Sequence, residues 1–146
     1  AGIDGSPWLK GSLELMLDPT GFAARWYHFA WNAVPESYAD WATGLIEDPL
    51  DPKYGQDDKE WNGKWSYEND RADGVWRSLV TVPFATLGAT TPVPGETWTM
   101  NFGREALPAV RGADFDANRL ILSLWSPNLE SRSFVSAAAF GKMVFK

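Results

Sequence analysis

The chain has 146 residues with 13 basic and 19 acidic side chains, a net charge of −6, and this length fits one domain (residues 1–146) that buries a core without covalent staples. The absence of cysteine excludes disulfides and thiolate metal sites, and the single histidine excludes a site built from several imidazoles of this chain. The acidic balance argues against nucleic acid as a partner, and no apolar run reaches the roughly 20 residues that a membrane span needs.

The first part of the chain predicts three strands. Residues 11–18 alternate leucines with Glu14, Met16 and Asp18, which predicts a strand with one buried face. Residues 25–32 carry aromatic side chains at both odd and even positions, which indicates a central strand. A short strand is predicted over residues 37–43.

The middle of the chain begins with a long loop. Periodicity stops over residues 44–60, where acidic residues, two prolines and a glycine gather. Strands are predicted over residues 61–67 and 75–82, and a polar turn is predicted over residues 68–74.

The last part continues the same pattern. Residues 83–88 predict one helical turn that Gly88 ends, and a strand over residues 97–104 places Trp98, Met100 and Phe102 on one face. Further strands are predicted over residues 119–125 and 140–146. Short strands separated by Pro/Gly turns predict an all-β sandwich or barrel.

The nine tryptophans are the most informative residues. Trp76 and Trp98 lie in alternating strands and are predicted to be buried. Others lie in polar, turn-rich segments, where an exposed aromatic residue indicates a binding surface; they are Trp8, Trp41, Trp61 and Trp65. Sugar rings stack their C–H faces on indoles, so the profile predicts an exported bacterial glycan-binding module that is extracellular or periplasmic.

Two features leave alternatives open. His28 is interpreted as a packed, hydrogen-bonded histidine, or as an axial haem ligand with Met16, Met100 or Met143 as its mate. The acids between Glu47 and Glu60 offer oxygen ligands that suit calcium as a structural ion, or they form a solvated, self-repelling loop. No other cofactor is expected to be required.

No motif in the chain indicates catalysis. A Gly-x-Ser-x-Gly nucleophile elbow, a Walker loop and a GxGxxG sequence are all absent. Nineteen acids offer many carboxylate pairs for glycoside hydrolysis, but no local pattern singles one out. The chain is therefore predicted not to be an enzyme.

A series of motifs resembles the family 9 carbohydrate-binding modules. They include a Pro-Trp pair before a Ser-x-Glu-x-x-x-Asp strand and a Trp-x-x-Asn-Phe-x-Arg strand, and they lie at residues 6–8, 12–19, 28–32, 74–84, 98–104, 124–127 and 140–141. The resemblance implies an antiparallel β-sandwich of the DOMON-like superfamily, with an immunoglobulin-like or jelly-roll-like arrangement. It also implies a non-catalytic module that serves a polysaccharide-degrading enzyme and binds plant or algal polysaccharide or oligosaccharide through an aromatic clamp.

Carried over by position, the resemblance assigns a glycan site. Trp8 and Phe134 match the two clamp positions, Glu14 matches the acid that binds sugar hydroxyls, and Asn101 and Arg104 belong to the same set. The alternatives are that Trp8 and Phe134 are core residues, that Glu14 lies on a solvent face, and that Asn101 and Arg104 hold turns. A haem-binding DOMON-type electron-transfer domain shares the implied fold and is the second functional hypothesis.

The resemblance also predicts that the protein has a partner. Family members carry several strands before the Pro-Trp motif, whereas this sequence begins almost at that motif. Missing strands would leave Leu13, Leu15 and Leu17 poorly covered and a sheet edge open. We therefore expect the N-terminal strands to come from another segment or chain, or the protein to self-associate.

Overall fold

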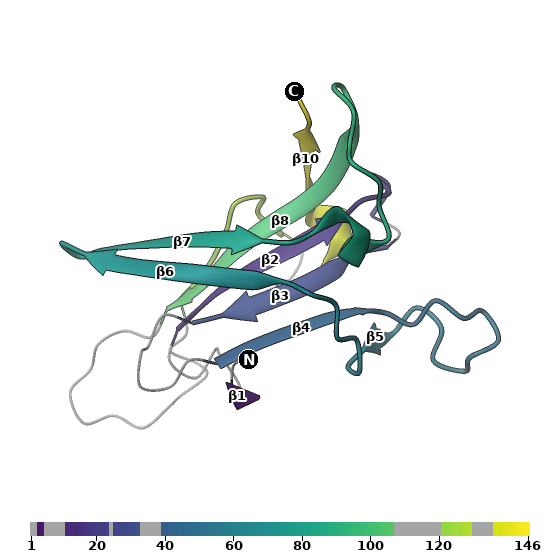
Figure 1. Cartoon of the computed structure of the whole chain (residues 1–146), viewed down its shortest axis with the longest axis horizontal. Coiled ribbons are helices and arrows are strands. Elements are labelled where there is room, and N and C mark those ends of the chain that lie inside the picture. Colours follow the sequence, from purple (N-terminus) through teal and green to yellow (C-terminus); the bar gives the residue numbers. More distant parts are fainter. Residues whose placement is uncertain (1–2, 5–10, 24, 33–38, 107–120, 130–135) are drawn as a thin grey trace.

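The computed structural model describes residues 3–4, 11–23, 25–32, 39–106, 121–129 and 136–146, and these form an all-β fold (Figure 1). The strands of the first half are β1 (Ile3–Asp4), β2 (Ser12–Asp18), β3 (Tyr27–Trp31), β4 (Ala39–Leu45), β5 (Asp57–Asp58) and β6 (Ser66–Ala72). The second half contains β7 (Val75–Thr81), the 3₁₀ turn η3 (Phe84–Leu87), β8 (Thr97–Ala106), β9 (Ile121–Leu124), the 3₁₀ turn η5 (Ala137–Ala139) and β10 (Gly141–Val144).

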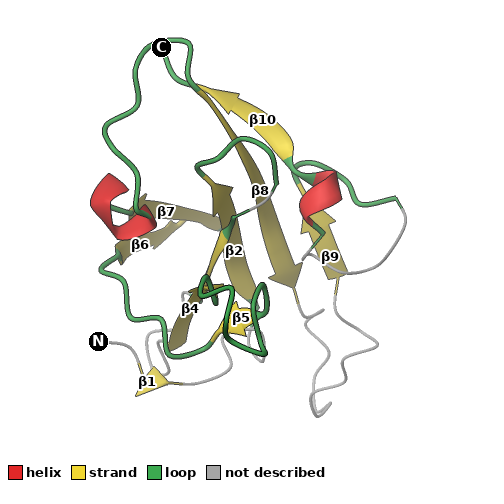
Figure 2. Cartoon of the chain, turned by 90° about the vertical axis from the view of Figure 1, so that its right-hand side faces the viewer, coloured by secondary structure: helices red, strands yellow, loops and turns green. Residues whose placement is uncertain are grey.

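Two antiparallel layers form a sandwich. The main sheet has the order β1-β4-β3-β2-β8-β10, and only the β1–β4 pair is parallel. β9 and β10 pair with opposite ends of β8, along the same edge (Figure 2). The second layer is the β6–β7 hairpin, which lies across β2 and β3 in Figure 1. The prediction of an all-β sandwich is confirmed.

β3 supplies the centre of the core. It lies between β2 and β4, and all five of its residues are buried, which confirms the prediction of a central strand. Tyr27, Phe29 and Trp31 share one face with Leu13 and Leu17 of β2, because these residues pair directly across the two strands. Trp98 joins this cluster and is buried, as predicted.

The prediction of a single buried face on β2 is wrong. Glu14, Met16 and Asp18 lie opposite the leucines, and their residues are only 5%, 0% and 0% exposed. β2 runs between β3 and β8, and both of its faces are covered. Alternation of leucines with polar residues therefore does not mark a solvent face here.

The predicted boundaries of the hairpin are also wrong. β6 begins at Ser66, and the polar stretch expected to be a turn continues the strand to Ala72. The turn consists of Asp73 and Gly74, whose φ angles are 54° and 74°. Two left-handed residues are the signature of a tight hairpin turn whose twist matches that of its strands.

Hydrogen bonds join the hairpin to the main sheet. The buried indole of Trp31 donates from Nε1 to Ser78 Oγ at 2.8 Å, and Ser78 Oγ donates to Asn69 Oδ1 at 2.8 Å. Asn69 Oδ1 also accepts from Trp76 Nε1 at 3.0 Å, and Asn69 Nδ2 donates to the carbonyl of Asn32 at 3.0 Å. We call this network of Trp31, Ser78, Asn69 and Trp76 the hairpin joint. Trp76 was predicted to be buried and is half-buried here.

The other predicted elements agree with the structure. The helical turn η3 ends at Gly88, which takes a φ of 63°. β8 covers the strand expected over residues 97–104, and β9 and β10 lie within the two strands expected near the C-terminus. The long loop is present, although β4 extends to Leu45 and the two residues of β5 pair with its end.

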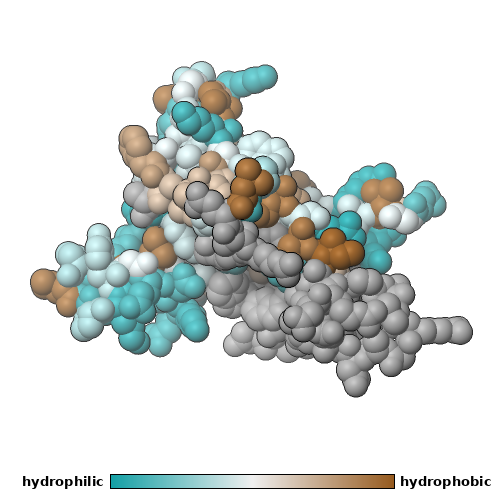
Figure 3. Space-filling model, turned by 180° about the vertical axis from the view of Figure 1, so that it is seen from behind, coloured by the Kyte–Doolittle hydropathy of each residue, from teal (hydrophilic) through white to brown (hydrophobic). Residues whose placement is uncertain are grey.

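The leucine face of β2 is covered within the chain itself. Leu13 and Leu17 belong to the buried core cluster, together with half-buried aromatic residues from residues 61–84. Large apolar side chains remain exposed on β9 and just after it, at Ile121, Leu122 and Trp125. Seen from behind, apolar side chains also gather among polar ones near the middle of the molecule (Figure 3). A partner segment or self-association remains a prediction.

Within the described residues, no helix has the length and apolar character needed to cross a bilayer.

We predict that Ser78→Ala lowers the free energy of unfolding by about 1–2 kcal/mol, because the buried Trp31 N–H loses its acceptor. Urea unfolding followed by tryptophan fluorescence measures this change. The matched control is Ser66→Ala, since Ser66 is exposed on the same hairpin. An equal effect of the two substitutions would show that the joint does not stabilise the sandwich.

Candidate functional site

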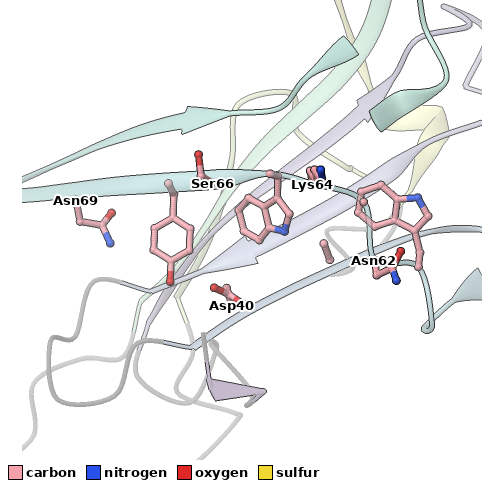
Figure 4. A pocket seen from close by; sticks show the side chains of 10 residues that line it. Asp40, Asn62, Lys64, Ser66 and Asn69 are labelled. Carbon is pink, nitrogen blue, oxygen red and sulfur yellow. The ribbon is translucent and has the colours of Figure 1, made fainter. Parts of the chain in front are cut away.

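A cavity of about 730 Å³ opens between β4 and β6 (Figure 4). Its lining comes from two places in the chain, namely β4, and β6 with the segment that leads into it. The described lining residues are Asp40, Ala42, Trp61, Asn62, Gly63, Lys64, Trp65, Ser66, Tyr67 and Asn69.

The aromatic part of the lining is held by the core. Trp61, Trp65 and Tyr67 are each half-buried, since they occupy the inward positions of an extended, alternating segment. The ring of Trp65 lies 5.2 Å from Phe29 and 5.5 Å from Tyr67, centroid to centroid. Each ring thus packs on β3 or on a neighbour that does, while the same side chain lines the cavity. Rings that are packed in this way before a ligand arrives lower the entropy cost of binding.

The polar part of the lining is available for hydrogen bonds. Asp40 projects from β4 and is half-buried, while Asn62 and Lys64 are exposed on the segment before β6. Figure 4 shows Asp40 between β4 and β6, with Asn62 and Lys64 at the other side of the cavity. None of these three side chains makes a hydrogen bond or ion pair with another residue that the structure describes. Asn69, by contrast, is fully engaged in the hairpin joint.

The prediction for the surface tryptophans is correct only in part. Trp61 and Trp65 line a cavity, but they are half-buried and each is also part of the core. Trp8 and the side chain of Trp41 lie outside the described residues. Asp40 and Tyr67 were not identified from the sequence as residues of this site. Tyr67 could have been found, because aromatic residues recur at odd positions between 61 and 67. No local pattern distinguishes Asp40.

Of the five residues assigned by resemblance, the structure describes three, and these three do not share one face of the sheet. Glu14 and Asn101 lie on the same face of the main sheet, but Arg104 lies on the opposite face, beside Leu13 and Trp76. Positions 101 and 104 differ by an odd number of residues, so a strand must point them to opposite faces. Trp8 and Phe134 lie outside the described residues.

Glu14 and Asn101 are both buried and paired. Glu14 Oε2 lies 2.7 Å from His28 Nε2, so the solvent-face interpretation of Glu14 is wrong. Asn101 donates from Nδ2 to the carbonyl of Ser126 at 2.9 Å, and its Oδ1 accepts from the backbone N–H groups of Ser126 and Phe102 at 3.0 Å. Asn101 therefore holds a turn, which was the alternative interpretation.

The contacts of His28 favour a packed histidine. Its residue is buried, its Nε2 faces Glu14, and its ring lies beside Trp26. Met16 is its direct cross-strand neighbour, whereas Met100 and Met143 lie on the other face of the sheet. An axial pair has to enclose the iron from two sides, which adjacent side chains on one face do not do.

Several acids of the long loop cap its turns. Asp48, Asp51 and Asp58 each accept a hydrogen bond from the backbone N–H two residues later, at 2.7–3.0 Å. This accounts for these carboxylates as turn formers. Among the described residues, no group of three or more acidic or histidine side chains is arranged to hold a metal ion. Calcium binding remains a prediction.

Glu105 has an unusual protonation equilibrium. Burial, and next the charge of Glu14, raise its pKa from the ordinary 4.5 to about 7, while a hydrogen bond from Ser12 opposes the shift. The hydroxyl of Ser12 lies 3.4 Å from a carboxylate oxygen of each glutamate. The two carboxyl groups therefore share one partly buried environment.

We predict that Glu105→Gln stabilises the protein at pH 8 and does so much less at pH 4.5. The unfolded chain releases the Glu105 proton near pH 4.5 and the folded protein only near pH 7, so stability is lost as the pH rises through this window. Thermal unfolding between pH 4.5 and pH 8 measures the difference. Glu68→Gln, an exposed control on β6, should show no such pH dependence; an identical profile for both variants would contradict the raised pKa.

Comparisons with known proteins find no relative of this chain. No family model matches the chain, and no curated protein or solved structure matches it either. The resemblance to family 9 modules therefore rests on sequence motifs, and the function has to be argued from the geometry of the side chains.

Proposed function

We propose that this protein is a non-catalytic carbohydrate-binding module that holds plant or algal polysaccharide or oligosaccharide in the cavity between β4 and β6. The observation that carries the proposal is one cavity lined both by Trp61, Trp65 and Tyr67, which pack on the core, and by the polar residues Asp40, Asn62 and Lys64. The module serves a polysaccharide-degrading enzyme outside the cell.

The cavity fits the two chemical faces of a sugar. A pyranose ring presents apolar C–H groups to an aromatic ring, and burial of both surfaces releases water. Its hydroxyl groups need donors and acceptors. Asp40 lies between β4 and β6, and Asn62 and Lys64, at the exposed positions of the segment before β6, are available at the edge of the cavity (Figure 4). A largely preformed apolar pocket with a few convergent polar groups is the usual form of a small-ligand site.

The acid position implied by the resemblance has weaker support. The carboxylate of Glu14 is buried and already paired with His28. A sugar hydroxyl would have to displace this contact, and leaving a buried polar group unsatisfied costs about 1–3 kcal/mol. The open cavity needs no such rearrangement.

The same cavity supports binding rather than hydrolysis. Glycosidases use two carboxyl groups that flank the scissile bond. Asp40 is the single carboxylate among the described residues that line the cavity. Glu14 and Glu105 lie close together, but neither lines a cavity described here.

We predict that Asp40→Ala lowers glycan affinity about tenfold, or ~1.4 kcal/mol, because a carboxylate that accepts sugar hydroxyls is lost. Isothermal titration calorimetry with soluble oligosaccharides measures the affinity. Asp70→Ala is the matched control, since Asp70 is exposed on the hairpin, and it should bind normally. Equal affinities for both variants would remove Asp40 from the site.

We predict that Trp65→Ala weakens glycan binding by about 1–3 kcal/mol, the scale of a buried aromatic anchor. Because Trp65 also packs on Phe29, the measurement is made at a temperature where circular dichroism shows the variant to be folded. Trp8→Ala is the comparison. If Trp8→Ala abolishes binding while Trp65→Ala does not, the clamp implied by the resemblance is the site, and the cavity is not.

A further inference from the structure

Trp61 lines a second cavity besides the one proposed to bind glycan. This cavity has a volume of about 330 Å³, and Arg25, Leu45, Glu47 and Thr86 contribute to its lining. Trp61 lines both cavities, which are therefore neighbours.

The indole of Trp61 is fixed in this place by its surroundings. Its ring centroid lies 5.3 Å from Tyr27 and 5.8 Å from Phe29. A Cβ atom at Gly44 would approach Trp61 to 3.1 Å, and one at Gly63 would collide with its six-membered ring. Two glycines thus make room for the indole where the chain passes close to it.

The second cavity has a sugar-compatible lining without excess positive charge. Arg25 forms an ion pair with Glu47 and lies 5.9 Å from the centre of the Tyr27 ring. Asp58 also lines this cavity. Together the two cavities carry the acids Asp40, Glu47 and Asp58 against the bases Arg25 and Lys64. A ligand with many carboxylate or sulfate groups finds no cationic surface here, so the lining suits a neutral sugar.

We propose that the two cavities are neighbouring subsites of one groove, which holds consecutive residues of a neutral glycan chain on the two sides of Trp61. This inference rests on the proposed function and adds the ligand class: a chain of at least two sugars rather than a single sugar. Glucose and xylose are neutral pyranoses whose equatorial hydroxyls leave C–H groups on both faces of the ring, so chains of either sugar are suitable probes of this groove.

The test combines ligand length with a variant that fills the second cavity. Calorimetry is carried out with glucose, with cello-oligosaccharides of two to six residues, and with the corresponding xylose series. We expect affinity to rise about tenfold or more from the monosaccharide to the longer chains. Glu47→Trp should remove most of this gain and leave monosaccharide affinity unchanged.

Two controls separate filling of the cavity from other effects. Glu47→Gln removes the charge but keeps the volume, so it should lose less of the gain with chain length than Glu47→Trp does. Leu50→Trp places the same side chain at an exposed position of the same loop, and it should bind like the unmodified protein. Thermal unfolding of Glu47→Trp verifies its fold, and Glu47→Phe provides a smaller filling substitution.

The outcomes distinguish this inference from the proposed function. Equal affinity for mono- and hexasaccharide, or full hexasaccharide affinity in folded Glu47→Trp and Glu47→Phe, overturns the second subsite and leaves the first cavity as the binding site. Binding that depends on length but is insensitive to Asp40→Ala and Trp65→Ala places the glycan elsewhere and overturns both. No binding of either series overturns glucose and xylose chains as the ligands of the groove.

Discussion

The structure depends on covering the aromatic face of β3. Tyr27, Phe29 and Trp31 form an apolar strip in the middle of the main sheet, and leaving it in water would cost about 25 cal/mol per Å². The β6–β7 hairpin covers part of this strip. The buried indole N–H of Trp31 also needs an acceptor, which Ser78 provides. Packing holds the two layers together, while this hydrogen bond and the Asn69 contacts determine where the hairpin sits.

The candidate site is a consequence of the same packing. The segment before β6 points every second side chain toward β3. Trp61 and Trp65 therefore pack part of their ring surface against Phe29 in the core. Their remaining surface lines the cavities between this segment, β4 and the end of η3. Binding surface and core are therefore built from the same residues. Rings that are immobilised for stability also give a ligand a surface that need not be ordered on binding.

The opposite face of the main sheet follows a different rule. It buries polar side chains, and each of those discussed above has a partner: Glu14 has His28, Asn101 has Ser126, and Ser12 lies between two glutamates. Buried polar groups are tolerated when their hydrogen bonds are made. Glu105 is the member that burial and a neighbouring charge keep protonated up to about pH 7. The motif residues found here help to build the sheet, whatever else they bind.

Local patterns of the sequence determined most of the strands and the turn at Gly88. The central place of β3 and the separation of Asn101 from Arg104 also follow locally, because they depend on the period of two along a strand. Other features depended on residues far away in the chain. Whether the Glu14 face of β2 is buried is decided by what covers the sheet. The polar residues of β6 form a strand because β7 pairs with them along its whole length. Asp40 meets Trp65 in one cavity only because β4 and β6 are brought together by the core between them.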